Sequence, residues 1–449
     1  MATPDEFTGP STELLQALIR NECVNDGTPD SGDETRNSDL LINYLEGSGL
    51  EVQRFTSRPG RDSMVARIEG SDPNAPSLCL MGHTDVVPVN PDGWSNDPFA
   101  GEIIDGEVWG RGAIDMLNLT STMAVAFRRL AQEGFKPKGD LIYFGVADEE
   151  AGGTWGAEWM AEHHWDAIDA DYVLTELGGW STTDEHGQRS ITVNVGEKGL
   201  AWRRLRVTGT PGHGSMPFGA DNALIKAAEV IRRLAAYRPA AHLDAIWEAQ
   251  IDSMNLTDDI RDGLKSAETI WETMEKLPTR VARTCHALTH TTFSPNVCHG
   301  GQKTNTIPDV IDIDLDIRTV PGTTGEDVEQ HLRDALGDLY EHVESTVLQD
   351  GHPTLSPSGP GNALWDSVSK NTQIAYPGAK LIPGLIVGGT DARFYRDRGS
   401  TAYGAGLFSD KMDFATFGSR FHGNDERIDT DSLGLSANYF YGIAKDLLS

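Results

Sequence analysis

Histidine and carboxylate side chains stand at the ends of several apolar runs, where a buried strand would open into a loop. The segments are "LCLMGHTDVV", "GRGAIDMLN", "FGVADEEAGG", "VLTELGG" and "FGSRFHGND". Deprotonated His, Asp and Glu bind divalent metal ions, and functional side chains concentrate where loops begin. The candidate ligands are His83, Asp115, Glu150, Glu176 and His422. They can supply one shared carboxylate, plus one histidine and one carboxylate for each of two ions, so the chemistry they suggest is activation of water by metal.

Two neighbouring carboxylates fit the same chemistry without binding metal. Glu149 can take a proton from a metal-held water. Asp85 can accept a hydrogen bond from the other ring nitrogen of His83 and so orient the ring. Asp148, Glu149 and Glu150 are consecutive, and such carboxylates repel one another unless cations are present. Nitrogen and oxygen donors without sulfur suit zinc, and also cobalt or manganese.

Each of these residues also has a purely structural interpretation. Asp115 precedes an apolar helical segment and can cap that helix, and His83 with Asp85 can end an ordinary strand. A hypothesis of another class is that the chain is a catalytically silent dimeric scaffold. The complete set of five candidate ligands with Glu149 argues against a silent protein, which would be expected to lose at least one.

Length and charge limit the classes of partner. A chain of 449 residues exceeds the roughly 250 to 300 residues of a single core, so we expect two domains. The net charge of −31 makes nucleic acid and anionic membranes poor partners, and we interpret the acidic excess as mostly solvated surface. The sequence has no apolar run of about 18 to 20 residues and no visible secretory signal. Its four cysteines form no C-x-x-C pair. We expect a cytoplasmic protein with reduced cysteines.

The order of predicted elements indicates an α/β fold. Apolar strand-like runs alternate with helical segments up to about residue 197, which is typical of a largely parallel sheet. Residues 198–350 read as β-α-β-β-α-β, a ferredoxin-like unit, interrupted by a polar helical insert at 242–288 with no evident chemistry. The first pattern resumes at 351–449. We therefore predict one domain from 1–197 and 351–449, with a second domain inserted into it.

A family resemblance adds to these inferences. The resemblance is to the M20 family of metallopeptidases and aminoacylases, in order and spacing from about residue 12 to 445, and it rests on "GHTDVVPV", "GRGAIDM", "ADEEAGG", "TELGG", "GTPGHGSMP", "NTIPD", "DIRTVPG", "GGTDARF" and "HGNDERI". One departure is "IDMLN", where Leu117 and Asn118 replace the Lys and Gly of many members.

The resemblance implies a zinc-peptidase-like catalytic domain with an inserted lid and dimerisation domain. Asp115 would bridge two divalent ions, most readily zinc, and Glu149 would be the general base. Asp85 would orient His83, and His213 would reach the partner subunit's active site in a homodimer. The remaining metal ligands would be His83 with Glu176 at one ion, and Glu150 with His422 at the other.

Substrate contacts are also carried over from the resemblance. Asn305 and Arg318 would hold the substrate, and the loop 388–393, with Gly389 and Thr390, would line the pocket. By residue type alone, His213 and Asn305 are equally loop or turn residues, and Arg318 can pair with surface carboxylates.

The implied reaction is hydrolysis of an amide. We expect N-acyl amino acids or short peptides with a free carboxylate, because "GGTDARF" and "HGNDERI" resemble aminoacylases and carboxypeptidase-like members. Succinyl-diaminopimelate desuccinylases usually carry Gly-Thr-Ser-Asp-Gly in the corresponding loop. The alternatives are deacylation of the acetylornithine or succinyl-diaminopimelate type, and hydrolysis of amidines or aromatic amines.

Overall fold

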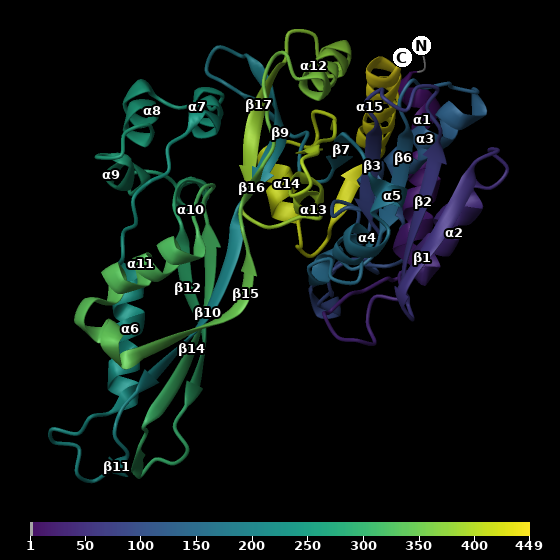
Figure 1. Ribbon diagram of the computed structural model, residues 1–449. Helices are drawn as coiled ribbons and strands as arrows, with labels where there is room; N and C mark the ends of the chain where they lie inside the picture. Colours follow the sequence, from purple (N-terminus) through teal and green to yellow (C-terminus); the bar gives the residue numbers. More distant parts are fainter. Residues whose placement is uncertain (1–2) are drawn as a thin grey trace.

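A ten-stranded mixed sheet forms the centre of the larger part of the molecule (Figure 1). The structure is a computed structural model that describes residues 3–449. The sheet runs in the order β1 (Glu51–Arg58), β2 (Arg61–Ile68), β6 (Leu141–Val146), β3 (Leu78–His83), β7 (Tyr172–Thr175), β18 (Thr401–Gly404), β9 (Arg189–Glu197) and β16 (Thr354–Leu355), and β17 (Lys380–Ile386) and β8 (Ser181–Thr183) also pair with β9. The four strands β6, β3, β7 and β18 are mutually parallel.

Helices cover both faces of this sheet, which is why its central strands are continuous apolar runs. All residues of β3 and β6 are buried. In β3, Leu78 and Leu80 pack into one core and Cys79 and Met81 into another, as the two-residue period of a strand requires. The first core includes α1 (Pro4–Arg20), α2 (Thr35–Leu45), α3 (Leu117–Gln132), α12 (Ala363–Ala375) and α15 (Thr430–Leu448), and the second includes α4 (Ala157–His163), α5 (Trp165–Ile168) and α13 (Ala392–Arg396).

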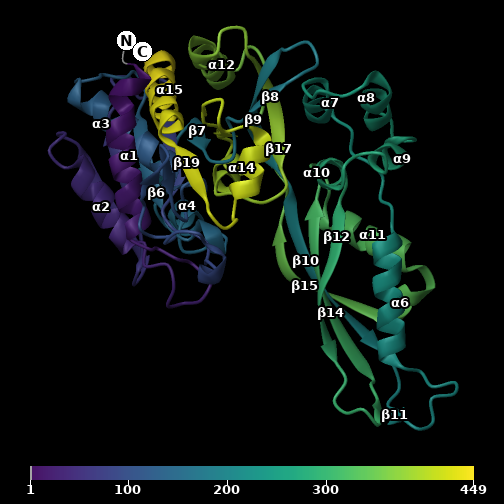
Figure 2. The ribbon, with the colours of Figure 1, turned by 180° about the vertical axis from the view of Figure 1, so that it is seen from behind.

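A second, four-stranded antiparallel sheet extends away from the first (Figure 2). Its order is β12 (Thr292–Gly300), β14 (Val310–Thr319), β10 (Gly199–Thr208) and β15 (Val343–Gly351). Two amphipathic helices, α6 (Ala223–Ala236) and α11 (Gly325–Leu336), bury their apolar sides against it. Along the chain these elements follow the β-α-β-β-α-β order of a ferredoxin-like unit.

Four short helices separate α6 from β12. They are α7 (Ala245–Asp252), α8 (Asp258–Leu264), α9 (Ile270–Met274) and α10 (Thr279–Thr289). They share a small core that includes Trp247, Ile251 and Leu264. Figure 1 shows α7 beside β17, at the margin of the large sheet. The segment predicted as a polar helical insert is therefore a compact helical unit in contact with the main sheet.

The remaining elements are short. A three-stranded sheet consists of β19 (Arg427–Asp429), β5 (Glu107–Trp109) and β4 (Ile103–Ile104), and a ribbon at the far end of the second sheet pairs β11 (Gly212–His213) with β13 (Thr306–Ile307). The helix α14 (Phe414–Arg420) lies between β18 and β19, and 3-10 turns occupy Pro91–Gly93, Glu149–Ala151 and Gly337–His342. Within residues 3–449, no helix has the length and apolar character needed to cross a membrane.

Candidate metal centre

Three adjacent parallel strands deliver polar side chains to one edge of the large sheet. His83 is the last residue of β3, Glu176 directly follows β7, and Glu149 and Glu150 follow β6. These strands are neighbours in the order β6, β3, β7. The carboxyl ends of parallel strands open together, and this is where α/β sheets place their ligand sites. The topology therefore explains why residues far apart along the chain meet here.

Two loops complete the cluster from outside the sheet. Asp115 lies just before α3, and His422 follows α14. The Nε2 atom of His83 is 3.2 Å from Asp115 Oδ1, and the Nε2 atom of His422 is 2.7 Å from Asp115 Oδ2. Each oxygen of Asp115 thus faces a different histidine.

The cluster divides into two groups of possible metal ligands that share Asp115. One consists of His83, Asp115 and Glu176, and the other of Asp115, Glu150 and His422; within each group the ligand atoms lie within 4.8 Å of one another. Glu176 Oε2 is 3.7 Å from His83 Nε2, and Glu150 Oε2 is 3.6 Å from His422 Nε2. Each group offers one imidazole nitrogen and two carboxylate oxygens, a donor set that suits zinc, cobalt or manganese.

The electrostatics of the cluster also fit a pair of cations. Burial raises the pKa of Glu176 to about 8, and the charge of Asp115 adds to this effect. Burial and the same charge raise the pKa of Glu150 well above its usual value, and Glu150 Oε1 is buried without a hydrogen-bond partner among the described residues. Carboxylates gathered in this way are costly unless cations compensate them. The residues present therefore fit two divalent ions.

Glu149 is a carboxylate at the centre that belongs to neither ligand group. Its Oε2 atom is 3.9 Å from His83 Nε2, and its side chain is 13% exposed. Burial, followed by the charge of Glu176, raises its pKa well above the usual range. A buried carboxyl group that belongs to neither ligand group is placed to exchange a proton with a water held between them.

Asp85 supports the centre in two ways. The Nδ1 atom of His83 lies 3.0 Å from the main-chain oxygen of Asp85 and 3.5 Å from its carboxylate, so the nearest partner of the ring is the backbone and not the side chain expected from the sequence. The carboxylate instead accepts hydrogen bonds from the Asn25 side chain (2.9 Å) and from the backbone N–H of Glu150 (3.1 Å). Asp85 therefore links the loop of the candidate ligand His83 to the loop of the candidate ligand Glu150.

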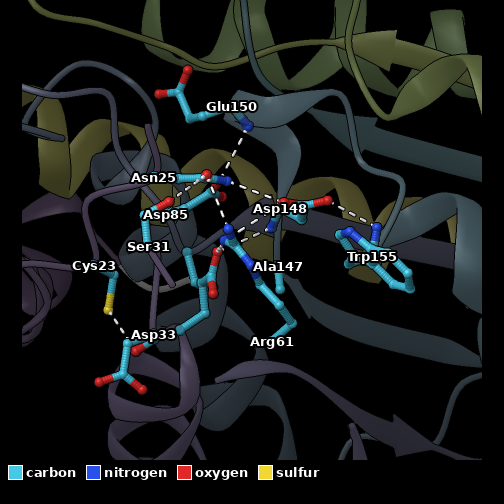
Figure 3. Close-up of polar contacts among 12 residues, drawn as sticks. Cys23, Asn25, Ser31, Asp33, Arg61, Asp85, Ala147, Asp148, Glu150 and Trp155 are labelled. Atoms are coloured by element: carbon cyan, nitrogen blue, oxygen red, sulfur yellow. Dashed lines mark hydrogen bonds and ion pairs between the residues drawn. The ribbon is translucent and has the colours of Figure 1, made fainter. Parts of the chain in front are cut away.

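Behind Asp85 lies a buried polar network that was not predicted from the sequence (Figure 3). Arg61 on β2 contacts Glu34 and donates to Asn25 Oδ1 at 3.0 Å. Asp148 Oδ1 lies 3.5 Å from Arg61 Nη1 and accepts a hydrogen bond of 3.2 Å from Asn25. The side chains of Arg61 and Glu34 are 3% and 0% exposed. Asp148, the first carboxylate of the triplet, thus faces this network and not the metal centre.

A second missed residue, Glu426, holds the Asp115 loop. Its Oε1 atom accepts hydrogen bonds from the backbone N–H groups of Ile114 (2.6 Å) and Asp115 (3.1 Å), and its Oε2 atom pairs with Arg111 at 2.6 Å. Glu426 is fully buried and lies four residues after His422. The only sequence signal was its place in "HGNDERI".

Three residues beside the cluster have left-handed backbones although none is glycine. The φ angles are 69° at Asp148, 62° at Leu177 and 53° at His422. Such conformations cost of order 1 kcal/mol or more each and gather at functional sites, where the surrounding structure enforces them.

A cavity of about 700 Å³ opens onto the cluster. Its lining includes Asp115, Glu149, Glu150, Glu176 and His422. Arg318, Gly389 and Arg283 also line it, and Arg283 was not predicted. Arg318 pairs with Asp316, with Nε 2.7 Å from Oδ1. A second cavity of about 390 Å³ shares Glu149, Glu150, Arg318 and Gly389.

The residues of the loop 388–393, which was predicted to line the pocket, differ in their positions. Thr390 lines neither cavity; it is buried, and its hydroxyl donates to Glu197 at 2.7 Å. Arg393 in the same loop lines the smaller cavity and donates to the backbone oxygen of Gly152 at 2.6 Å. Gly389 is therefore the part of this loop that faces both cavities.

His213 and Asn305 lie together, away from the cluster of the same chain. His213 on β11 and Asn305 beside β13 are exposed at the far end of the second sheet (Figure 2). The Nδ1 atom of His213 is 2.8 Å from the hydroxyl of Ser215, and Gly214 N–H donates to Asn305 O at 2.8 Å. Neither residue lines the cavities of its own chain.

Comparisons with known proteins agree with this geometry. Residues 79–446 match the model of Peptidase family M20/M25/M40. The chain is 28% identical to human aminoacylase-1 over 400 residues, covering 88% of this chain and 86% of the relative. It is 26% identical over 390 residues to the N-fatty-acyl-amino acid synthase/hydrolase PM20D1 of Xenopus tropicalis, covering 85% of this chain and 74% of that protein.

The fold has solved counterparts. The M20 family metallo-carboxypeptidase Sso-CP2 from Sulfolobus solfataricus superimposes with a TM-score of 0.68 at 19% sequence identity, covering 97% of this chain and 99% of that chain. Agreement over almost the full length of both chains shows that the arrangement of strands and helices described above is that of M20 peptidases.

Proposed function

Because the chain belongs to Peptidase family M20/M25/M40, and is therefore a hydrolase of C–N bonds, we propose that it is a two-metal amidohydrolase. Its substrates are N-acyl amino acids or short peptides that carry a free carboxylate. The observation that carries the proposal is the pair of ligand groups sharing Asp115, with Glu149 beside them at the end of one cavity. The similarity to aminoacylase-1 and to a hydrolase of N-fatty-acyl amino acids supports the substrate class.

Five side chains would hold the ions. Asp115 would be shared, His83 and Glu176 would complete one site, and Glu150 and His422 the other. The ions, most readily zinc, would supply Lewis acidity that lowers the pKa of water and polarises the substrate carbonyl. Asp85, through its contacts with Asn25 and Glu150, would keep the ligand loops in place.

Glu149 is the residue we assign to proton transfer. It would take a proton from the attacking water and return it to the leaving nitrogen. The direction of its pKa shift supports this role, since a carboxylate with a raised pKa is a stronger base toward water. Its position outside both ligand groups leaves its carboxylate available.

The second sheet would act as a lid and as the surface of a homodimer. His213 and Asn305 are exposed at its far end, so they are available to another subunit. In the dimer, His213 of the partner subunit would stabilise the oxyanion, and Asn305 would contact the substrate. Neither role requires these residues to approach the centre of their own chain.

The substrate carboxylate needs a positive partner in a strongly acidic protein. Arg318 lines both cavities, and its guanidinium can bind a carboxylate through two hydrogen bonds. We expect Arg318→Met to raise KM for an N-acyl amino acid about tenfold or more, with a smaller effect on the corresponding amino acid amide. Arg283→Met is the matched control, because Arg283 lines the larger cavity only.

The decisive experiment is Glu149→Gln in the zinc-loaded protein. The variant should bind zinc and unfold at the wild-type urea concentration, but lose hydrolysis by about a hundredfold or more. Glu162→Gln, on the surface helix α4, is the control and should keep full activity. Unchanged turnover in Glu149→Gln would reject the mechanism.

A substrate panel separates the alternatives. It should contain N-acyl amino acids, dipeptides, N-acetylornithine and N-succinyl-diaminopimelate, and turnover of only the last two would replace the proposed substrate class. No hydrolysis of any compound with zinc, cobalt or manganese would favour the silent scaffold. Mixing His213→Ala with Glu149→Gln subunits should restore some activity if His213 acts across the dimer, and no recovery after demonstrated subunit exchange would exclude that role.

A further inference from the structure

The helical unit formed by α7–α10 is anchored to the catalytic part of the molecule. Ile246 on α7 is buried in the largest core, which also contains residues of β9 and β17. The Nζ atom of Lys198, where β9 passes into β10, donates to the backbone oxygens of Ala287 (2.8 Å) and His290 (2.7 Å) on and after α10. Arg280 donates to the backbone oxygen of Ala415 on α14 at 3.3 Å. The unit is thus fixed beside the metal centre at several points.

One side of this helical unit faces the large cavity. Its own core is filled by other side chains, among them Trp247, Ile251 and Leu264. Met254 and Leu288 pack at the edge of this core, and together with Ala287 they also line the cavity, where all three are only partly buried. Removing such accessible apolar side chains from water contributes favourable free energy to the binding of an apolar ligand.

The apolar lining that comes from the catalytic part of the molecule is aromatic and aliphatic. Trp180 and Phe417 lie 5.0 Å apart between ring centroids, and Phe421 stacks on the ring of His422 at 4.3 Å with an angle of 13°. From β17, Ile382 and Leu385 add aliphatic surface. The aromatic wall therefore continues directly into the metal centre, through the stack on His422.

The size and lining of the cavity point to a large apolar ligand group. A volume of about 700 Å³ lies in the range of sites for small organic molecules. An acetyl group would occupy little of it, and water gains few hydrogen bonds on apolar walls. A long alkyl chain or an aromatic group would cover the apolar side chains of both parts of the lining while the amide lies at Glu149 and the ligand groups.

We propose that α7–α10 is the substrate-recognition element of this enzyme, and that it binds a large apolar group, a long alkyl chain or an aromatic ring system, on one side of the scissile amide. This proposal rests on the proposed function for the identity of the site. It gives the helical unit, for which the sequence indicated no chemistry, a role in selecting long-chain or aromatic substrates over acetylated ones.

The test uses probes that cannot be hydrolysed, so that it does not depend on turnover. Binding of N-ethyl-, N-octyl- and N-dodecylglycine, which carry a carboxylate and no amide, is measured by calorimetry on the full-length protein with and without zinc. Affinity should increase about fourfold for each methylene that enters the cavity, until the cavity is filled. Equal affinity for all three probes would overturn the proposal.

Variants then locate the binding wall. Ala287→Phe takes up cavity space beside the helical unit and should reduce the gain from octyl to dodecyl, and Met254→Ala should weaken dodecyl binding several-fold. Leu256→Ala is the matched control, because Leu256 is half-buried on the same small core but does not line the cavity. Chain-length dependence equal to that of the wild type in both cavity variants would place the alkyl chain elsewhere and refute the proposal, provided their urea unfolding is that of the wild type.

The outcomes distinguish this inference from the proposed function. Retained chain-length dependence with no hydrolysis of any N-acyl amino acid would contradict the proposed function alone. Efficient hydrolysis of N-acetyl amino acids, with no preference for longer or aromatic groups and no chain-length dependence of binding, would contradict the inference alone.

Discussion

Lys198 provides a quantitative test of the junction between the two sheets. It is 3% exposed, and its Nζ donates to two backbone oxygens of the α10 segment. Burial, and then the nearby charge of Arg318, lower its pKa from 10.5 to about 7. A lysine that is protonated less readily in the folded state than in the unfolded state makes stability depend on pH.

The sign and size of this dependence follow from the two pKa values. Between about pH 7 and pH 10.5 the unfolded chain binds more protons at this residue than the folded chain, so stability rises with pH and is lost as pH falls toward 7. Applying the linkage relation to a pKa of about 7 folded and 10.5 unfolded, we expect a gain of about 2 kcal/mol between about pH 7 and pH 9.

The assay compares urea unfolding of the wild type and Lys198→Met at about pH 7, 8 and 9. The wild-type free energy of unfolding minus that of the variant should rise by about 2 kcal/mol over this range, because other titrating groups cancel in the difference. The same substitution at Lys370, whose side chain is 64% exposed, is the control. A difference that stays constant with pH, or that falls, would refute the reasoning.

Three further outcomes follow from the buried charges. Arg61→Met should lower the free energy of unfolding in urea by about 3–5 kcal/mol, because Glu34 and Asp148 lose their buried cation. The control Arg129→Met, in an exposed ion pair, should lower it by less than about 1 kcal/mol, and equal losses in the two variants would contradict this reasoning. Removing metal with a chelator should lower the midpoint of thermal unfolding, and zinc at about a thousand times its Kd should restore about 4 kcal/mol of the free energy of unfolding. A midpoint that the chelator does not change would count against a metal centre. Asp85→Asn should weaken zinc binding about 10- to 100-fold in competition with a chelating dye, and an unchanged affinity would remove its supporting role.

Much of the fold was accessible from local patterns. The uninterrupted apolar runs of β3 and β6 predicted buried strands of a largely parallel sheet, and the change of pattern near residue 198 predicted a second unit. Helix boundaries were harder to predict. The helix α1 begins at Pro4, although apolar periodicity was clear only from about residue 11. Its start is defined by the proline in the first turn and by the Thr3 capping box.

The sequence by itself determined which donor atoms are available. His83, Asp115, Glu150, Glu176 and His422 each follow an apolar run or a glycine-rich turn, and such short-range signals are visible without coordinates. What these residues do together depends on distances between them, and only the tertiary structure supplied those distances.

The tertiary structure alone decided the supporting contacts and the shape of the cavity. Arg61 meets Glu34 and Glu426 meets the Asp115 backbone across 27 and 311 residues of sequence, and no local pattern marks such pairs. The helical unit α7–α10 looked merely polar because charged and polar side chains are frequent along it. Its apolar cavity wall exists only where the chain folds it against the main sheet, since burial is a property of the whole assembly of elements and not of any one segment.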